Sequence, residues 1–436
     1  MKKNLIALAV AAAFIVPTSA FAADNSSNDN TGPVVYGYAQ ITGSTQFGTG
    51  PASVVHSNGS SSNGLIFGAN RVRLGFKGEA TKGVTYNIMG AWDNIGFGGN
   101  SGNLGYGNGL NNGLDTNWNG SSAGNAQLLD AWINFAPIPL AQLEVGKFKT
   151  PEGLEYNAVK GNELPFIFRN MGQSLLPGRT AGAMLHADDV MGTGVSYAVG
   201  IFDNAALDGG TVFSGGNTFG GGQSGFLNGN GKYITSGMLS YSMSPLLIAE
   251  VSGSMGTVSN GLTNTSDNDV SWNVGVRGGL MGITYAAGYT RVNGGLNNGY
   301  LNLPGNTPFK GDNTGSGTIN ASDWHVDLGA NLYKMGLLPL DVEPVVRYDQ
   351  YSVNDITGHP RGFGNLANTT IGVNYYVNPN NAHAAEIQLN YIIPSHRGGA
   401  FGNGYGNAGY RGFTGYDAPM NGLAYDTLML QFQAGF

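Results

Sequence analysis

Charged side chains recur at every second position in one short stretch of the sequence. Arg71, Arg73 and Lys77 share one parity, whereas the positions of the other parity between them are Val, Leu and Phe. Side chains of an extended strand point alternately to opposite faces, so these cations would gather on one face. A row of cations along an aqueous passage can select ions by the sign of their charge. Pairing of the cations with carboxylates is the alternative interpretation, and the sequence leaves both open.

Other basic residues occupy comparable positions. Arg277 and Arg347 have the polar parity of their runs, whereas Lys147 has the apolar parity of Val145. Lys147 would face the polar side only if its strand bulges at Gly146. Together these positions predict a set of lumen-facing cations: Arg71, Arg73, Lys77, Lys147, Lys149, Arg179, Arg277 and Arg347.

A carboxylate–histidine row is the one candidate for metal binding or catalysis. Asp323, His325 and Asp327 share a parity. Alternate residues of a strand lie roughly 6.5–7 Å apart, so their side chains would have to lean together to share a ligand. A polar lumen wall explains the row as well. No Gly-x-Ser-x-Gly motif occurs in a strand-turn-helix context and there is no Cys, and the glycine clusters do not follow a βαβ pattern. The sequence therefore predicts no catalytic residue, no metal site and no cofactor.

An apolar cluster interrupts the long polar segment 149–178. Residues 164–168 read LPFIF, and such a cluster needs a surface to pack against. The inner wall of a barrel would provide one, and the segment would then narrow the passage. A subunit contact or a lid would also bury the cluster. The predicted constriction residues are Lys160, Glu163, Phe166, Phe168 and Arg169.

The elements that must position these residues are strands. The chain shows about sixteen alternating runs, joined by short and long Gly- and Asn-rich connections in turn. Such a rhythm predicts an all-β transmembrane antiparallel barrel with short periplasmic turns and long extracellular loops. Closure follows because lipid leaves no partner for an open sheet edge. A β-helix or propeller would show a repeat of fixed period, and none is present. Tyr36, among other aromatics, is expected in an interfacial girdle.

Composition and the chain start agree with an exported barrel. Of 436 residues 41% are hydrophobic but only 11% are charged, and the net charge of −7 argues against a nucleic-acid partner. Residues 1–22 have the basic start, apolar core and small-residue site of a cleaved signal peptide. We therefore expect a signal peptide at 1–22, a flexible segment at 23–33 and the barrel at 34–436. The last strand alternates and closes on Phe436.

Six segments carry a family resemblance: residues 129–135 (LDAWINF), 145–155 (VGKFKTPEGLE), 176–182 (LPGRTAG), 197–204 (YAVGIFDN), 369–378 (TTIGVNYYVN) and 387–391 (IQLNY). In this order and spacing they resemble the phosphate-selective porin O and P family of bacterial outer-membrane porins. The resemblance implies a sixteen-stranded homotrimeric channel in the outer membrane, with its third loop folded inward and often a preference for anions. The strand ending at Phe436 also resembles the signature that the barrel-assembly machinery reads.

The resemblance departs from the family in charge. Two of the chain's 20 Lys and Arg lie in the leader, which leaves 18, and acidic residues accompany the basic ones in segment 149–178. The expected function is passive diffusion of small hydrophilic solutes and ions, with anions such as phosphate as a possible preference. The expected partners are these solutes and the outer-membrane lipid. A structural or adhesive surface barrel and, less favoured, an outer-membrane enzyme are the alternatives.

Overall fold

Almost every element of the chain is a β-strand. The computed structural model describes residues 32–47, 66–92, 95–96, 127–138, 140–203, 233–260, 265–295, 318–356, 364–397 and 426–436. The strands in these ranges are β1 (Val34–Phe47), β2 (Ile66–Thr81), β3 (Val84–Ala91), β4 (Ile95–Gly96), β5 (Gln127–Ile138), β6 (Ala141–Lys149), β7 (Arg179–Ala187), β8 (Val195–Asp203), β9 (Tyr233–Met243), β10 (Leu247–Asn260), β11 (Thr265–Leu280), β12 (Ile283–Gly295), β13 (Thr318–Ala330), β14 (Val342–Ile356), β15 (Gly364–Tyr376), β16 (Ala385–Arg397) and β17 (Asp426–Gly435). The helical turns are α2 (Leu154–Ala158), η3 (Met171–Leu175), η4 (Val190–Gly192) and η5 (Ala382–Ala384).

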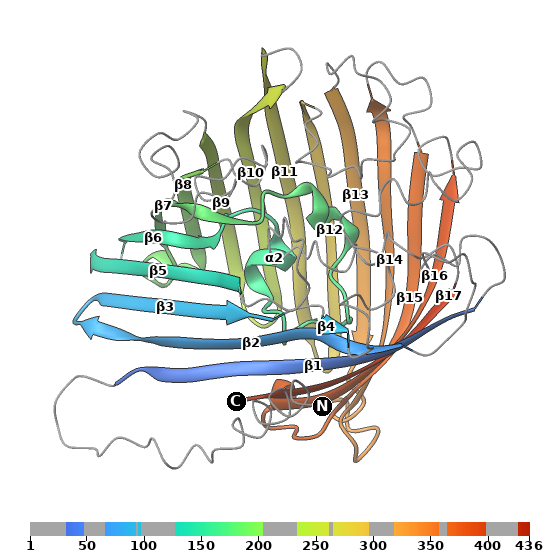
Figure 1. Ribbon diagram of the computed structural model, residues 1–436. Helices are drawn as coiled ribbons and strands as arrows, with labels where there is room; N and C mark the ends of the chain where they lie inside the picture. Colours follow the sequence, from blue (N-terminus) through green and yellow to red (C-terminus); the bar gives the residue numbers. More distant parts are fainter. Residues whose placement is uncertain are drawn as a thin grey trace, which may run out of the picture.

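The strands form one closed antiparallel barrel (Figure 1). Each pairs with its neighbours in sequence, and β1 closes the sheet because it pairs with both β2 and β17. The two-residue β4 continues β3 along β2, so seventeen assigned segments make a sixteen-stranded barrel. The predicted fold class and strand number are confirmed.

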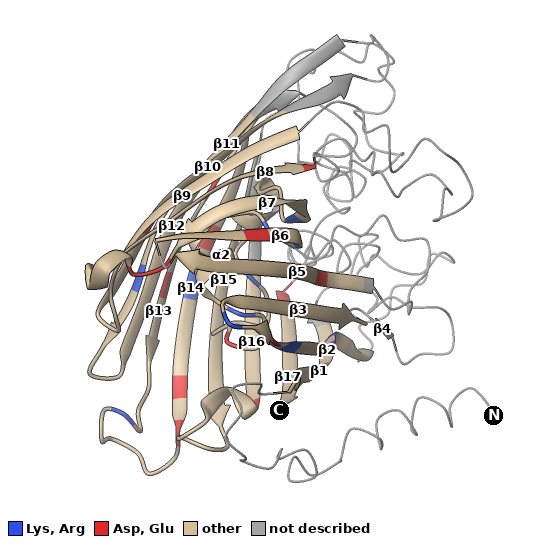
Figure 2. Cartoon of the chain, turned by 90° about the vertical axis from the view of Figure 1, so that its left-hand side faces the viewer, with Lys and Arg blue, Asp and Glu red and all other residues tan. Residues whose placement is uncertain are grey.

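The two faces of the wall differ in polarity, as the period-two pattern requires. In β17, Phe432 is 47% exposed on the outer face, whereas Gln431 and Gln433 are buried on the inner face. In β11, Val274 is 45% exposed outside and Asn273 is buried inside. Charged positions are correspondingly sparse along the strands (Figure 2). A wall that is apolar outside and polar inside needs an apolar medium around it.

Some strands extend beyond their alternating runs. The β10–β11 pairing continues to Asn260 and Thr265, beyond the apolar pair of Met255 and Val270. Backbone pairing does not depend on apolar side chains, so a hairpin can continue through the polar residues that follow.

The chain start was assigned from the sequence alone. The predicted signal peptide, and all but residues 32 and 33 of the predicted flexible segment, lie outside the described residues. No helix among the described residues is long and apolar enough to cross a membrane.

Candidate functional site

The segment between β6 and β7 crosses the interior of the barrel (Figure 1). Near its start it contacts β10 and β11, where Gly153 N donates to Ser252 Oγ of β10 at 2.9 Å and Leu154 N to Asn273 Oδ1 of β11 at 3.2 Å. It then reaches β1, where Gln40 Nε2 donates to the carbonyl of Gly161 at 3.0 Å. These contacts join one connection to widely separated strands. We call residues 150–178 the inner segment.

The apolar cluster of the inner segment is buried against the inner wall. Ile167 is fully buried with Ile392 of β16 and Met429 of β17, and Phe168 packs on this group. The backbone N of Ile167 donates to Asn390 Oδ1 at 2.9 Å. The burial surface that the LPFIF sequence demands is therefore the barrel interior.

Arg347 of β14 holds the inner segment through charge. It makes a two-pronged contact with Asp327 of β13, from Nε to Oδ1 at 2.8 Å and from Nη2 to Oδ2 at 2.6 Å. Its Nη2 also lies 2.6 Å from Oε1 of Glu155 in α2, and its Nη1 donates to the carbonyl of Phe168 at 3.0 Å. The guanidinium carbon lies 4.4 Å from the centre of the Phe166 ring. Arg347 thus faces the interior as predicted, but its charge is already neutralised there.

A second cluster surrounds Tyr156, a residue that the sequence pattern did not single out. Its buried ring lies 4.6 Å from Lys149 Nζ, 5.6 Å from the guanidinium of Arg169 and 5.8 Å from that of Arg179. Lys149 also donates to the carbonyl of Tyr156. Arg179 is paired with Asp130 of β5, from Nε to Oδ1 at 2.7 Å.

Near these clusters the interior holds a cavity of about 570 Å³, which we call the cationic cavity. Five basic side chains line it, against the acidic side chains Asp130 and Glu163: Arg73, Lys77, Lys149, Lys160 and Arg179. The aromatic rings of Tyr36, Tyr38 and Trp132 complete the wall. Tyr36 was expected in the outer girdle. Instead it faces inward, where its hydroxyl donates to Asn87, because the apolar face of β1 is the one that carries Val35.

Two charged residues of the cavity differ in their surroundings. Lys77 lies over the neutral ring of Tyr36, with Nζ 5.2 Å from the ring centre. Lys160 is 77% exposed and pairs with Glu163 at 2.8 Å within the inner segment. An exposed pair of this kind holds its partners only weakly. Both ammonium groups therefore remain accessible to a solute in the cavity.

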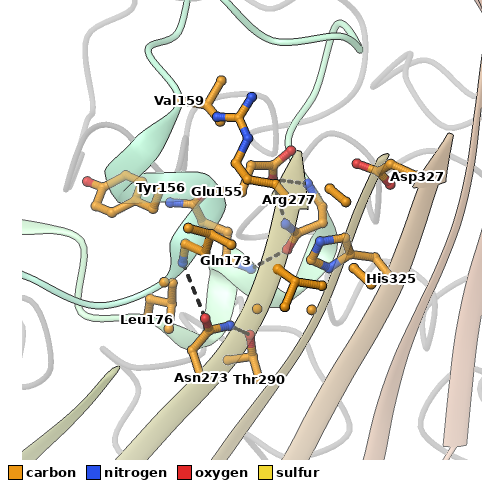
Figure 3. Close-up of a pocket in the computed structure, with 18 of the residues that line it drawn as sticks. Glu155, Tyr156, Val159, Gln173, Leu176, Asn273, Arg277, Thr290, His325 and Asp327 are labelled. Atoms are coloured by element: carbon orange, nitrogen blue, oxygen red, sulfur yellow. Dashed lines mark hydrogen bonds between the residues drawn. The ribbon is translucent and has the colours of Figure 1, made fainter. Parts of the chain in front are cut away.

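Arg71 and Arg277 lie deeper under the inner segment. Arg71 donates to Gln40 Oε1 at 2.9 Å and to the carbonyl of Ile167 at 3.3 Å. Arg277 donates to the carbonyl of Ala158 at 3.3 Å. It lines a small pocket of about 40 Å³ between α2 and the wall, together with Glu155, His325 and Asp327 (Figure 3).

Arg169 and Lys147 complete the predicted set. Arg169 lies inside the inner segment and donates to the carbonyls of Glu155 at 2.6 Å and Val159 at 2.7 Å. Lys147 is paired in register with Ala131, in the phase of the outward Val145, and donates to the carbonyl of Leu128 at 2.9 Å. The register of β5 and β6 shifts only beyond Phe135. A bulge at Gly146 is therefore absent, and Lys147 has the outer-face parity instead of the predicted lumenal one.

The predicted carboxylate–histidine row faces the interior. Asp323, His325 and Asp327 are all buried. Nδ1 of His325 lies 3.9 Å from Oδ1 of Asp323, whereas Asp327 is held by Arg347. Among the described residues no group of three or more potential ligands is arranged to hold a metal ion. The ion pair of Asp327 with Arg347 agrees with the interpretation of this row as part of the polar lumen wall.

Two carboxyl groups of the inner segment have pKa values shifted in opposite directions. Burial alone raises the pKa of Glu155, but Arg347 and Arg169 outweigh burial and bring the pKa down to about 2. Burial raises the pKa of Glu152 to about 7, opposed by hydrogen bonds from Ser254 and Ser271. Glu155 is therefore a charged anchor, and Glu152 titrates near neutrality.

Comparison with known proteins identifies the class of fold. No family model matches the sequence, and no curated protein shows significant similarity. Among solved structures, the chain is similar to an anion-selective porin from Comamonas acidovorans, with 11% identity, 93% of this chain and 99% of that chain covered, and a TM-score of 0.53. It is also similar to the trimer form of OmpT, an outer membrane protein of Vibrio cholerae, with 10% identity, 93% of this chain and 100% of that chain covered, and a TM-score of 0.52. A third similar structure is Salmonella typhi OmpF in complex with daunomycin, with 12% identity, 93% of this chain and 97% of that chain covered, and a TM-score of 0.56. Identities this low show a shared fold, which is the sixteen-stranded barrel of outer-membrane porins.

Proposed function

We propose that this chain is an outer-membrane porin for passive diffusion of small hydrophilic solutes and ions. The observation that carries the proposal is the interior: the inner segment crosses a closed barrel and leaves a cationic cavity beside it. A passage with such a lining gives solutes a polar route through a wall whose outer face suits lipid. The inner segment acts as the constriction.

We further propose a preference for anions, phosphate among them. Basic side chains outnumber acidic ones on the cavity wall, five to two among the described lining residues. Two of these cations, Arg179 and Lys160, already face a carboxylate. The preference is therefore modest, and it depends on the exposed Lys77 and on the residual field of the other cations that line the cavity. The solved anion-selective porin of similar fold is consistent with this assignment.

The test is conductance of the purified, folded protein in a planar bilayer. We expect stable channels whose zero-current potential under a salt gradient has the sign of anion selectivity. Added phosphate should reduce the chloride current as it occupies the cavity. Absence of conductance from folded protein contradicts the porin assignment, whereas a cation-selective potential contradicts only the anion preference.

Three further parts of the assignment come from the sequence, the first from the residues of the chain start and the other two from resemblance. We propose that residues 1–22 are cleaved on export, that the β17 strand ending at Phe436 is read by the barrel-assembly machinery, and that three copies assemble. The mass of the mature protein checks the first. Replacement of Phe436 by Ala, scored by the fraction of heat-modifiable barrel in the outer membrane, checks the second. The mass of the unheated, detergent-solubilised oligomer checks the third.

A further inference from the structure

The turns at one end of the barrel differ sharply in polarity. Those joining β9 to β10, β11 to β12 and β13 to β14 expose large apolar side chains, with Met281 82% and Leu337 64% exposed. Met243, Leu246, Tyr333 and Leu340 are exposed in the same three turns. By contrast, the turn between β15 and β16 is Asn-rich, and the one between β2 and β3 carries Lys82.

The three apolar turns form one continuous surface. Gly279 N donates to the carbonyl of Pro245 at 2.9 Å, and Tyr285 Oη to that of Leu246 at 2.7 Å, which joins the first turn to the second. Asn331 N donates to the carbonyl of Gly282 at 2.7 Å, which joins the second to the third. We call this surface, formed by residues 243–246, 280–283 and 331–340, the apolar turn patch.

The third turn, between β13 and β14, is held in one conformation by hydrogen bonds within the turn. Leu337 N donates to the carbonyl of Leu332 at 2.9 Å, and Met335 N to that of Asn331 at 3.1 Å. Asn331 Nδ2 donates to Oδ1 of the buried Asp341 at 2.5 Å. The exposure of the apolar side chains is therefore a property of an ordered turn. Lys334 is the one charged residue within the patch.

We propose that the apolar turn patch inserts into the phospholipid interface of the leaflet at the short-turn end of the barrel. The patch continues the apolar outer wall of β9 to β14, where Leu239, Val251 and Leu328 are exposed. Aliphatic side chains match acyl chains, and a single lysine at the edge of such a surface can extend toward lipid phosphates. A protein-binding surface would instead carry polar groups around an apolar centre. The Asn-rich turn between β15 and β16 stays in water.

This inference rests on the proposed membrane barrel, and the experiment separates the two. The chain has no Cys, so single-Cys variants can be labelled cleanly with an environment-sensitive fluorophore. Met281→Cys and Leu337→Cys report on the patch, Asn380→Cys on the polar turn, and Ile371→Cys on the outer wall. Each labelled protein is reconstituted into phosphatidylethanolamine–phosphatidylglycerol vesicles. Quenching is then measured with brominated phospholipids and with aqueous iodide.

We expect brominated lipid, but not iodide, to quench the labels at 281 and 337, and iodide to quench the label at 380. Iodide quenching at 281 and 337, with lipid quenching retained at 371, overturns the lipid contact and leaves the membrane barrel intact. Protection of 281 and 337 from both quenchers overturns it in favour of a protein partner, such as a second copy. Failure of lipid to quench the label at 371 overturns the membrane barrel itself.

Discussion

At the scale of single residues, most lumenal cations serve as structural anchors. Arg347 joins two strands and the inner segment, and Arg179 of β7 pairs with Asp130 of β5 at the cavity wall. A buried cation of this kind does not guarantee stability by itself, because desolvation offsets much of the attraction. Removal of one partner is different, since it leaves a buried charge without compensation. The anchors are therefore better probed by deletion of one member than by exchange of the whole cluster.

Replacement of Arg347 by Met should destabilise the protein strongly. Asp327 and Glu155 would remain buried without their counter-charge, at a cost of roughly 3–5 kcal/mol in the free energy of unfolding. Urea unfolding in detergent micelles, followed by tryptophan fluorescence, measures this change. Lys160→Met is the matched control, because the exposed Lys160–Glu163 pair contributes at most about 1 kcal/mol. Equal effects of the two substitutions would contradict an anchoring role for Arg347.

The two shifted carboxyl groups predict opposite pH dependences. Glu155 has a lowered pKa of about 2, so the stability it contributes is complete above its ordinary value near 4.5 and is lost as pH falls from there toward 2. The contribution is of the order of 3 kcal/mol. The melting temperature of the wild type should therefore fall as the pH is lowered from 4.5 toward 2, and Glu155→Gln should remove this fall. If the melting temperature of this variant falls with acid as it does in the wild type, other groups control the acid dependence.

Glu152 has a raised pKa of about 7. The stability linked to its protonated form is complete below pH 4.5 and is lost as pH rises from there through 7. Glu152→Gln keeps a neutral side chain at every pH, so it should stabilise the protein at pH 8 relative to wild type and change little at pH 4. The same melting measurement at the two pH values checks this. A stabilisation that is equal at both would indicate a packing effect instead.

At the scale of elements, the inner segment is the proposed constriction of the passage. Its apolar cluster is anchored by backbone and side-chain contacts to β14, β16 and β17. Replacement of residues 160–169 by a short Gly–Ser linker should widen the pore while leaving every strand in place. Single-channel conductance should rise, and sugars larger than the wild-type limit should enter proteoliposomes. Replacement of turn residues 378–381 by the same linker is the control and should leave the conductance unchanged. Unchanged conductance in the first variant would show that the constriction lies elsewhere.

The strands were predictable from sequence because their signal is local. The period-two alternation places Arg73, Arg277 and Arg347 on the inner face without knowledge of any neighbour. Register is not local, and it decides which groups meet. Asp327 lies directly across from Arg347 in the β13–β14 pairing, whereas Glu155 reaches Arg347 across 192 positions of sequence. Pairing partners therefore could not be predicted, and neither could the cluster around Tyr156, whose ring has no distinguishing spacing.

The lumenal position predicted for Lys147 was wrong, although the local alternation of the strand indicated the correct one. Its apolar parity indicated an outward position, and a lumenal position required a bulge at Gly146, which the β5–β6 register does not contain. Tyr36 was misplaced for a similar reason, since an aromatic residue near a strand end suits the girdle as well as the lumen. In both cases the parity of the flanking residues, Val145 and Val35, was the better guide.

At the scale of the whole molecule, the proposed function predicts that the charge distribution decides which ions pass. The outer wall is apolar, the apolar turn patch extends it at one end, and the basic side chains lie around the cavity inside. A charge on the turn side, outside the cavity, acts on a solute only through water and salt, which screen it within about 10 Å at 0.1 M ionic strength. Selectivity should therefore respond to lumenal charges and not to the net charge of the chain.

Lys77→Gln tests this directly. One unit charge at roughly 8 Å from an ion in water contributes about 0.5 kcal/mol, favourable for an anion and unfavourable for a cation, so loss of the Lys77 charge should reduce the anion-to-cation permeability ratio by up to about sixfold. The zero-current potential across a planar bilayer under a potassium chloride gradient measures the ratio. Lys82→Gln, which removes the same charge from the turn after β2, should leave the ratio unchanged. The Lys77 effect should shrink as the mean salt concentration rises. Equal shifts in both variants would mean that the overall charge of the protein, and not the cationic cavity, sets the selectivity.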